Sequence, residues 1–259
     1  MKHFEQIIER VIEVAKNHED ILGVCLAGSY INKETDIFSD LDFVIITKNN
    51  SQFSISEMTS FAKNSGDFLI GFTGEHVGEN KLLICLFDNP VTHIDFKFTQ
   101  LKDFYSRIEN PVIIYDKSDF LENIYKETVP LWPKPDLQWI ENRFWVWIHY
   151  AATKLGRKEF FETIDFISFL RANVIGPLFH LKYNKDPRGV RKLEFFLDQN
   201  EISQLRKTIP NYSFESIKDS LMELIEIYRN LRSLVFTKNI NINFKVEEIA
   251  INYLEKINQ

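Results

Sequence analysis

Two apolar, strand-like runs joined through a glycine turn constrain the fold of the N-terminal half more than any other feature. The runs cover residues 21–26 and 40–47, and a Gly28-Ser29 pair lies between them. Glycine permits the tight turn that ends the first run. In the second run, Asp40 and Asp42 project from one face, because residues i and i+2 of a strand share a face. The sequence therefore predicts a sheet in which a glycine turn lies near two carboxylates.

These residue types point to metal and phosphate chemistry. Two adjacent carboxylates repel each other unless a cation lies between them. All-oxygen ligands favour Mg²⁺, which in proteins commonly accompanies phosphates. A Gly28-Ser29 turn that leads into a helix supplies backbone N–H groups for a phosphate. The combination indicates nucleotidyl transfer.

A third carboxylate is predicted on a later strand. Residues 91–98 alternate between polar and apolar side chains, which is the pattern of a half-buried strand. Asp95 is the acidic residue in the middle of the polar face, where it is flanked by His93 and Lys97. We expect Asp95 to complete the site. Either His93 or Lys97 could contact a phosphate, but the default interpretation is that both are surface residues.

The composition changes at residues 130–136, where three prolines interrupt helix and strand alike. We therefore predict two domains, 1–129 and 130–259. The first is an α+β domain with a mixed sheet flanked by helices, and the second is an all-α domain. Its helices are expected at residues 137–155, 159–181, 189–197, 202–207, 214–237 and 246–257.

The N-terminal pattern resembles the nucleotidyltransferase superfamily with the polymerase-β-like fold. In that superfamily a Gly-Ser turn, a strand bearing D-x-D and a third carboxylate form the site. The matching residues are Gly28, Ser29, Asp40, Asp42 and Asp95. The length and two-domain layout are most similar to lincosamide and aminoglycoside nucleotidyltransferases. The resemblance is specific over residues 20–117, with local likenesses at 86–89 and 113–117, and it is loose in the helical half.

This resemblance implies a reaction and a set of ligands. Asp40, Asp42 and Asp95 would bind two Mg²⁺ ions, and an NTP would be the co-substrate. Gly28 and Ser29 would hold its phosphates, and the acceptor would be a hydroxyl group of a small molecule, such as an antibiotic. Some relatives have a glutamate as the third carboxylate. Whether Asp95 binds metal, takes the proton or does both therefore stays open.

The helical half is expected to present the acceptor. Lys154 and Arg157 lie between two predicted helices, in a segment that in the antibiotic-modifying relatives faces the nucleotide and acceptor. They are candidate triphosphate contacts. Glu159 and Asp165 are candidates for binding a cationic acceptor or acting as the base. A helix N-terminus also favours Glu159 for purely structural reasons.

Composition narrows the possible partners and surroundings. The formal net charge of −6 disfavours a general nucleic-acid binder, which usually carries a basic face. The two cysteines lie in apolar runs and are expected to be free and buried. The N-terminus lacks a signal-peptide pattern, and no apolar run approaches the ~20 residues of a membrane span. We expect a cytoplasmic enzyme, monomer or homodimer, whose partners are an NTP and a small acceptor rather than nucleic acid or membrane.

Two alternatives remain open at this point. The first is AMP transfer to a protein, which is disfavoured because relatives of that kind are typically single small domains. The second is a nucleotide-binding or interaction protein that has lost catalysis. The intact set of three candidate carboxylates argues against that loss.

Overall fold

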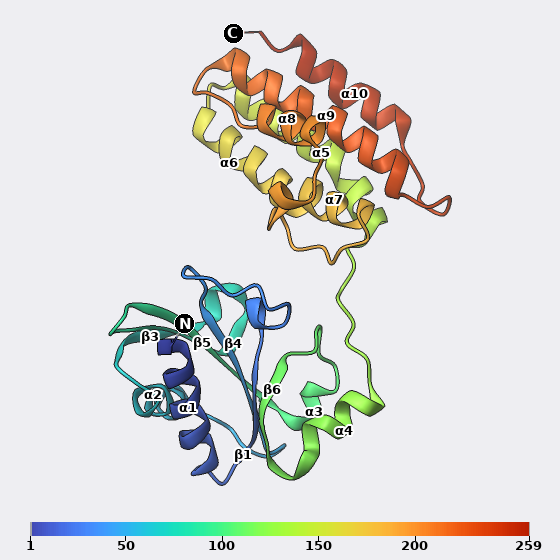
Figure 1. Cartoon of the computed structure of the whole chain (residues 1–259). Coiled ribbons are helices and arrows are strands. Elements are labelled where there is room, and N and C mark those ends of the chain that lie inside the picture. Colours follow the sequence, from blue (N-terminus) through green and yellow to red (C-terminus); the bar gives the residue numbers. More distant parts are fainter. Residues whose placement is uncertain (1, 259) are drawn as a thin grey trace. The chain divides into compact units, whose positions relative to one another are not determined.

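The computed structural model describes residues 2–258 and divides the chain into two compact units, Met1–Trp132 and Pro133–Gln259. The division falls within the proline-rich segment. The N-terminal unit contains a mixed six-stranded sheet with helices, and the C-terminal unit is helical (Figure 1). The predicted fold class is confirmed.

The sheet has the strand order β3-β4-β5-β2-β1-β6. Its strands are β1 (Ile21–Leu26), β2 (Leu41–Thr47), β3 (Phe68–Gly74), β4 (Glu79–Phe87), β5 (Thr92–Gln100) and β6 (Val112–Asp116). The neighbours β2 and β5 run parallel, whereas the other neighbouring pairs are antiparallel. Strands β2 and β5, which are far apart in sequence, therefore begin at the same end of the sheet.

Helices cover the two faces of this sheet to different extents. Helices α1 (Lys2–Lys16) and α2 (Ile55–Asn64) pack on one face, over a phenylalanine-rich core that includes the stacked rings of Phe43 and Phe96. Helices α3 (Leu101–Phe104) and α4 (Phe120–Glu127) pack on the other face, over a smaller core. Side chains on the rest of that second face are half-buried or exposed, and they include Asp42 and Asp95.

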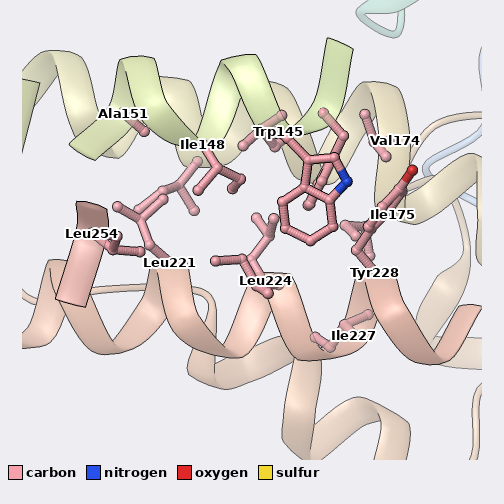
Figure 2. Close-up of a cluster of buried hydrophobic side chains, with 14 of the residues drawn as sticks. Trp145, Ile148, Ala151, Val174, Ile175, Leu221, Leu224, Ile227, Tyr228 and Leu254 are labelled. Atoms are coloured by element: carbon pink, nitrogen blue, oxygen red, sulfur yellow. The ribbon is translucent and has the colours of Figure 1, made fainter. Parts of the chain in front are cut away.

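The helical unit has one continuous core. Its helices are α5 (Leu137–Gly156), α6 (Phe160–Leu170), α7 (Gly176–Lys182), α8 (Gln199–Lys207), α9 (Phe214–Val235) and α10 (Phe244–Lys256). Trp145 of α5 and Tyr228 of α9 are the largest fully buried side chains of the unit and lie among its aliphatic residues (Figure 2). The tryptophans of α5 are thus partly core residues.

One helical stretch is long and apolar enough to span a membrane, by its length and composition alone. A π-helical turn, Arg171–Ile175, joins α6 to α7, so that Phe160–Lys182 forms 23 helical residues. Half of its apolar window is buried inside the unit. Its buried residues include Ile167, Leu170 and Val174, which belong to the same core as Trp145. The core helix of a folded unit can have the same length and apolar composition.

One local prediction was wrong, and one helix was not predicted. Residues 189–197 were expected to form a helix, but Gly189 and Lys192 adopt positive φ, which limits helical structure to a 3₁₀ turn at Leu193–Phe195. Helix α4 was not predicted. Its start depends on the Asp116 carboxylate, which accepts hydrogen bonds from the backbone N–H groups of Leu121 and Glu122. This cap is separated from the helix by a turn and is hard to recognise in sequence.

Candidate active site

Asp42 and Asp95 lie directly side by side. Asp42 is the second residue of β2, and the parallel register places it opposite Asp95 of β5. Neighbouring strands are ~4.8 Å apart, so the two side chains project from one face as close neighbours. Both are half-buried. The sequence predicted Asp42 on the same strand face as Asp40, and Asp95 on the polar face of a later strand; the parallel β2–β5 pairing brings Asp42 and Asp95 together.

The Gly28 turn fits closely against Asp42. The backbone N–H of Ala27 donates to the carbonyl oxygen of Asp42 at 2.8 Å. Gly28 itself has φ +60°, and a Cβ atom built on it would lie 1.9 Å from Oδ2 of Asp42. Only glycine lets the turn and the carboxylate occupy these positions together.

Ser29 presents a polar atom that is suited to a ligand. Its Oγ is buried, and within residues 2–258 it finds no hydrogen-bond partner. Buried hydroxyl groups are normally hydrogen-bonded, and one without a partner calls for an explanation. Its position directly after Gly28 places this hydroxyl in the turn that lies against Asp42. A bound oxyanion or polar ligand would satisfy it.

Asp40 precedes β2 and lies at the edge of the same site. It is half-buried and lines a hollow of about 430 Å³ together with His93. The negative charge of Asp40 is one of those that raise the pKa of His93. Asp40, Asp42 and Asp95 therefore all lie near one imidazole.

His93 contacts the third carboxylate directly. Its Nε2 lies 2.7 Å from Oδ1 of Asp95. This hydrogen bond raises the pKa of His93 above its ordinary value; partial burial lowers it, and the charges of Asp95, Asp40 and Asp42 raise it again. His93 is exposed, as interpreted from the sequence, but its bond to Asp95 was not predicted. The signal was present in the sequence, since residues 93 and 95 share a strand face.

The pair predicts a titration that can be measured in the protein without divalent cations. We expect NMR of the imidazole to place the His93 midpoint above 6.5 and the Asp95→Asn variant to lower it, because the charged acceptor is removed. The charged His93–Asp95 pair stabilises the folded protein fully at pH values below the unfolded-state pKa of histidine, about 6.5. This contribution is lost as the pH rises through the higher, folded-state pKa of His93. A midpoint unchanged in the variant would contradict the assignment.

The site offers oxygen donors of the kind that Mg²⁺ prefers. Among residues 2–258, no group of three or more His, Cys, Asp or Glu side chains forms a closed metal-binding cluster. Asp42 is directed toward the Gly28 turn, and Asp95 is engaged by His93. The adjacent carboxylates and the unsatisfied Ser29 hydroxyl nevertheless supply a donor set that fits a hard cation with phosphate oxygens.

A larger hollow, of about 830 Å³, is lined in part by residues that are close in sequence to the carboxylates and the Gly28 turn. Its lining includes Ala27, Val44 and Lys97. Val44 and Lys97 stand two residues beyond Asp42 and Asp95 and are paired with each other in the same register. Lys97 forms an ion pair with Glu79 at 3.1 Å. A hollow of this volume accommodates a small molecule.

In the helical unit, Lys154 is held by two carboxylates. Its Nζ lies 2.7 Å from Glu159 and 3.0 Å from Glu162. Tyr150 donates a hydrogen bond to Glu162 as well. The hydrogen bonds to Glu159 and Glu162 raise the pKa of Lys154, so it stays protonated. The sequence analysis did not predict a role for Glu162 or Tyr150, although Glu162 follows Glu159 at the helical i+3 spacing.

The other two residues predicted in this half are exposed. Arg157 ends α5, where its backbone N–H donates to carbonyl groups of the last turn. Asp165 lies on α6. Lys154 and Glu159 are thus brought into contact, whereas Arg157 and Asp165 present their side chains to solvent.

The two cysteine thiols of the N-terminal unit are protonated near neutral pH. Cys25 and Cys85 are free and buried, as predicted. Burial raises the pKa of each thiol to about 12, and the charge of Asp95 adds to this effect at Cys85. Neither thiol forms a thiolate near neutral pH, which is the nucleophilic form.

Comparison with solved structures finds similar chains that are distant in sequence. An aminoglycoside 6-adenyltransferase from Bacillus subtilis is 18% identical, with 98% of each chain covered and a TM-score of 0.43. A spectinomycin adenyltransferase from Enterococcus faecialis, solved with ATP and spectinomycin, is 12% identical, with 98% of this chain and 99% of that one covered and a TM-score of 0.34. A nucleotidyltransferase-like protein from Exiguobacterium sibiricum is 11% identical, covering 88% and 75%, at a TM-score of 0.39. No curated protein matches the chain.

A family model gives the decisive comparison. The model described as streptomycin adenylyltransferase matches residues 1–257, which is nearly the whole chain. This match confirms the resemblance to antibiotic nucleotidyltransferases and identifies the protein as a nucleotidyltransferase enzyme. The chain belongs to the streptomycin adenylyltransferase family.

Proposed function

We propose that the protein transfers AMP from ATP to a hydroxyl group of a small antibiotic, an aminoglycoside or a lincosamide. The observation that carries this proposal is the pairing of Asp42 with Asp95 beside the Gly28-Ser29 turn. Membership of an adenylyltransferase family supports ATP as the nucleotide. The helical unit would bind the acceptor, as we proposed for residues 130–259.

Mg²⁺ is the proposed cofactor, with Asp40, Asp42 and Asp95 as the residues that would hold it. When bound, it would neutralise phosphate charge and lower the pKa of the acceptor hydroxyl. A readout besides activity is available in His93. Mg²⁺ bound at Asp95 should lower the NMR midpoint of His93, because a cation beside the imidazole disfavours its protonated form.

The residues of the chain have distinct roles in the proposed reaction. The N–H groups of the Gly28 turn and the Ser29 hydroxyl hold the β- and γ-phosphates. The acceptor oxygen attacks the α-phosphorus in line, forms the new P–O bond and breaks the bond to the bridging oxygen of pyrophosphate. Asp95 receives the hydroxyl proton, and pyrophosphate departs on the Gly28 side.

Lys154, Arg157, Glu159 and Asp165 remain proposed ligand contacts in the helical unit. Lys154 is permanently charged and paired with Glu159 and Glu162. A triphosphate would compete with those carboxylates for it. Release of Glu159 and Glu162 would then leave two negative charges available to the ammonium groups of an aminoglycoside. We propose a cytoplasmic enzyme, where ATP is supplied, acting as a monomer or homodimer.

The test is pyrophosphate release from purified protein with Mg²⁺, each of the four NTPs, and streptomycin or lincomycin. We expect release with ATP and at least one acceptor, and a loss of about a thousandfold in the Asp42→Asn variant. Asp219→Asn is the control, since Asp219 is an exposed residue of α9. Equal rates in the Asp42→Asn variant and wild type would refute the assignment of the site.

A further inference from the structure

Four apolar side chains form an exposed surface on the sheet. Ile70 and Phe72 of β3 are paired with Leu86 and Ile84 of β4. Ile70 is 62% exposed, Phe72 53% and Leu86 37%, and Ile84 is half-buried. We call these four residues the apolar strip. Exposed clusters of large apolar side chains commonly mark binding surfaces.

The apolar strip adjoins the catalytic carboxylates on the same face. The antiparallel register of β4 with β5 places Ile84 opposite Asp95, and Leu86 opposite His93. Directly opposed residues on antiparallel strands point to one face with their Cβ atoms about 5 Å apart. The strip is therefore the surface next to Asp95 on the side away from Asp42.

The sheet order fixes which ligand this surface meets. Going across the sheet, the order is the Gly28 turn after β1, Asp42 on β2, Asp95 on β5, and then the strip on β4 and β3. In-line transfer requires the attacking oxygen and the departing pyrophosphate to lie on opposite sides of the α-phosphorus. With the phosphates held at Gly28 and Ser29, the acceptor lies on the Asp95 side.

We propose that the apolar strip binds the part of the acceptor beside its reactive hydroxyl, and that it selects an acceptor with an apolar face there. This inference rests on the proposed function. The four side chains carry no hydrogen-bonding group and no charge, so they stabilise alkyl or ring carbon through burial. A polycationic amino sugar gains little from such a surface. The strip therefore favours an amphiphilic acceptor of the lincosamide kind.

Pairing with a second copy through edge strand β3 is the competing use of this surface. An exposed edge strand is a template for adding another strand. The β3–β4 register is irregular at two points, between Phe68 and Ile70 and between Thr73 and Gly74. Such irregularities twist an edge and disrupt regular pairing. The location beside Asp95 and this irregular edge favour the acceptor as occupant.

The test compares binding and turnover in an Ile70→Thr/Phe72→Thr double variant. We expect calorimetry with lincomycin, in the presence of a non-reactive ATP analogue, to show a Kd about tenfold higher or more than for wild type. The Kd of the ATP analogue should not change. Ile55→Thr is the control, because Ile55 is 62% exposed and lies on α2, which packs on the other face of the sheet. It should bind lincomycin like wild type.

Three results would overturn the inference. They are an unchanged lincomycin Kd in the double variant, no lincomycin binding to wild type, or a change in sedimentation mass that identifies the strip as a contact between copies. The outcome is separable from that of the proposed function. AMP transfer to streptomycin, together with a lincomycin Kd that is unchanged in the double variant, would keep the function and remove the inference. If lincomycin binding depended on the strip but no pyrophosphate were released, the strip would be a binding surface and the proposed function would be wrong.

Discussion

Gly28→Ala should reduce kcat/KM for AMP transfer by about a hundredfold or more while leaving the protein folded. The added Cβ would stand 1.9 Å from Oδ2 of Asp42 and 3.1 Å from its Cγ. The nearest atoms belong to a side chain that can rotate, so the clash is relieved by displacing the Asp42 carboxylate. The cost falls on the site, because Asp42 then no longer points to its place beside Asp95. Steady-state kinetics with ATP and calorimetry with an ATP analogue measure the effect.

Gly78→Ala is the matched control for this variant. Gly78 also has a positive φ, +79°, but a Cβ there meets nothing within 4 Å. Both variants bear the cost of alanine in the left-handed region, roughly 1 kcal/mol. They should therefore show similar losses of thermal stability, with activity lost only in Gly28→Ala. Equal activities in the two variants would mean that the close fit of Gly28 to Asp42 has no catalytic role.

The two carboxylates of the pair could be predicted because the residues next to each of them in sequence indicate a strand and the face on which the carboxylate lies. The period of a strand places Asp40 and Asp42 on one face of residues 40–47, and alternation places Asp95 on the polar face of residues 91–98. That β2 and β5 are parallel neighbours is a property of the whole sheet order. The sequence alone therefore predicted the residues, and the resemblance to a family supplied the expectation that they meet.

The residues that were missed act through contacts between side chains. His93 shares a face with Asp95, yet the spacing does not reveal whether they bond. Glu162 and Tyr150 are identified as partners of Lys154 only once the two helices pack. The exposure of Ile70 and Phe72 was also hidden, because a short apolar run reads as a buried strand. At the sheet edge, such a run stays partly uncovered.

Glu141→Ala should destabilise the helical unit by about 3–5 kcal/mol. Glu141 is 3% exposed and is the common partner of a buried network. It accepts hydrogen bonds from Tyr228 and, at 3.2 Å, from Arg232. Trp145 also donates to it at 3.3 Å. Its removal leaves the Arg232 guanidinium, which is 8% exposed, with Glu247 as its carboxylate partner. An unpaired buried charge costs far more than a surface one.

Tryptophan fluorescence during denaturant unfolding measures this loss where it occurs, since Trp139, Trp145 and Trp147 of α5 report on the helical unit. Glu141→Gln keeps the shape and an acceptor oxygen, and should cost less than Glu141→Ala because the Tyr228 hydroxyl still has a partner. Glu226→Ala removes an exposed i,i+3 ion pair with Arg229 and should cost roughly 0.5 kcal/mol or less. If Glu141→Ala were as mild as Glu226→Ala, the buried network would contribute nothing to stability, and apolar packing such as that of Phe144 and Trp145 against Tyr228 would hold α5 to α9.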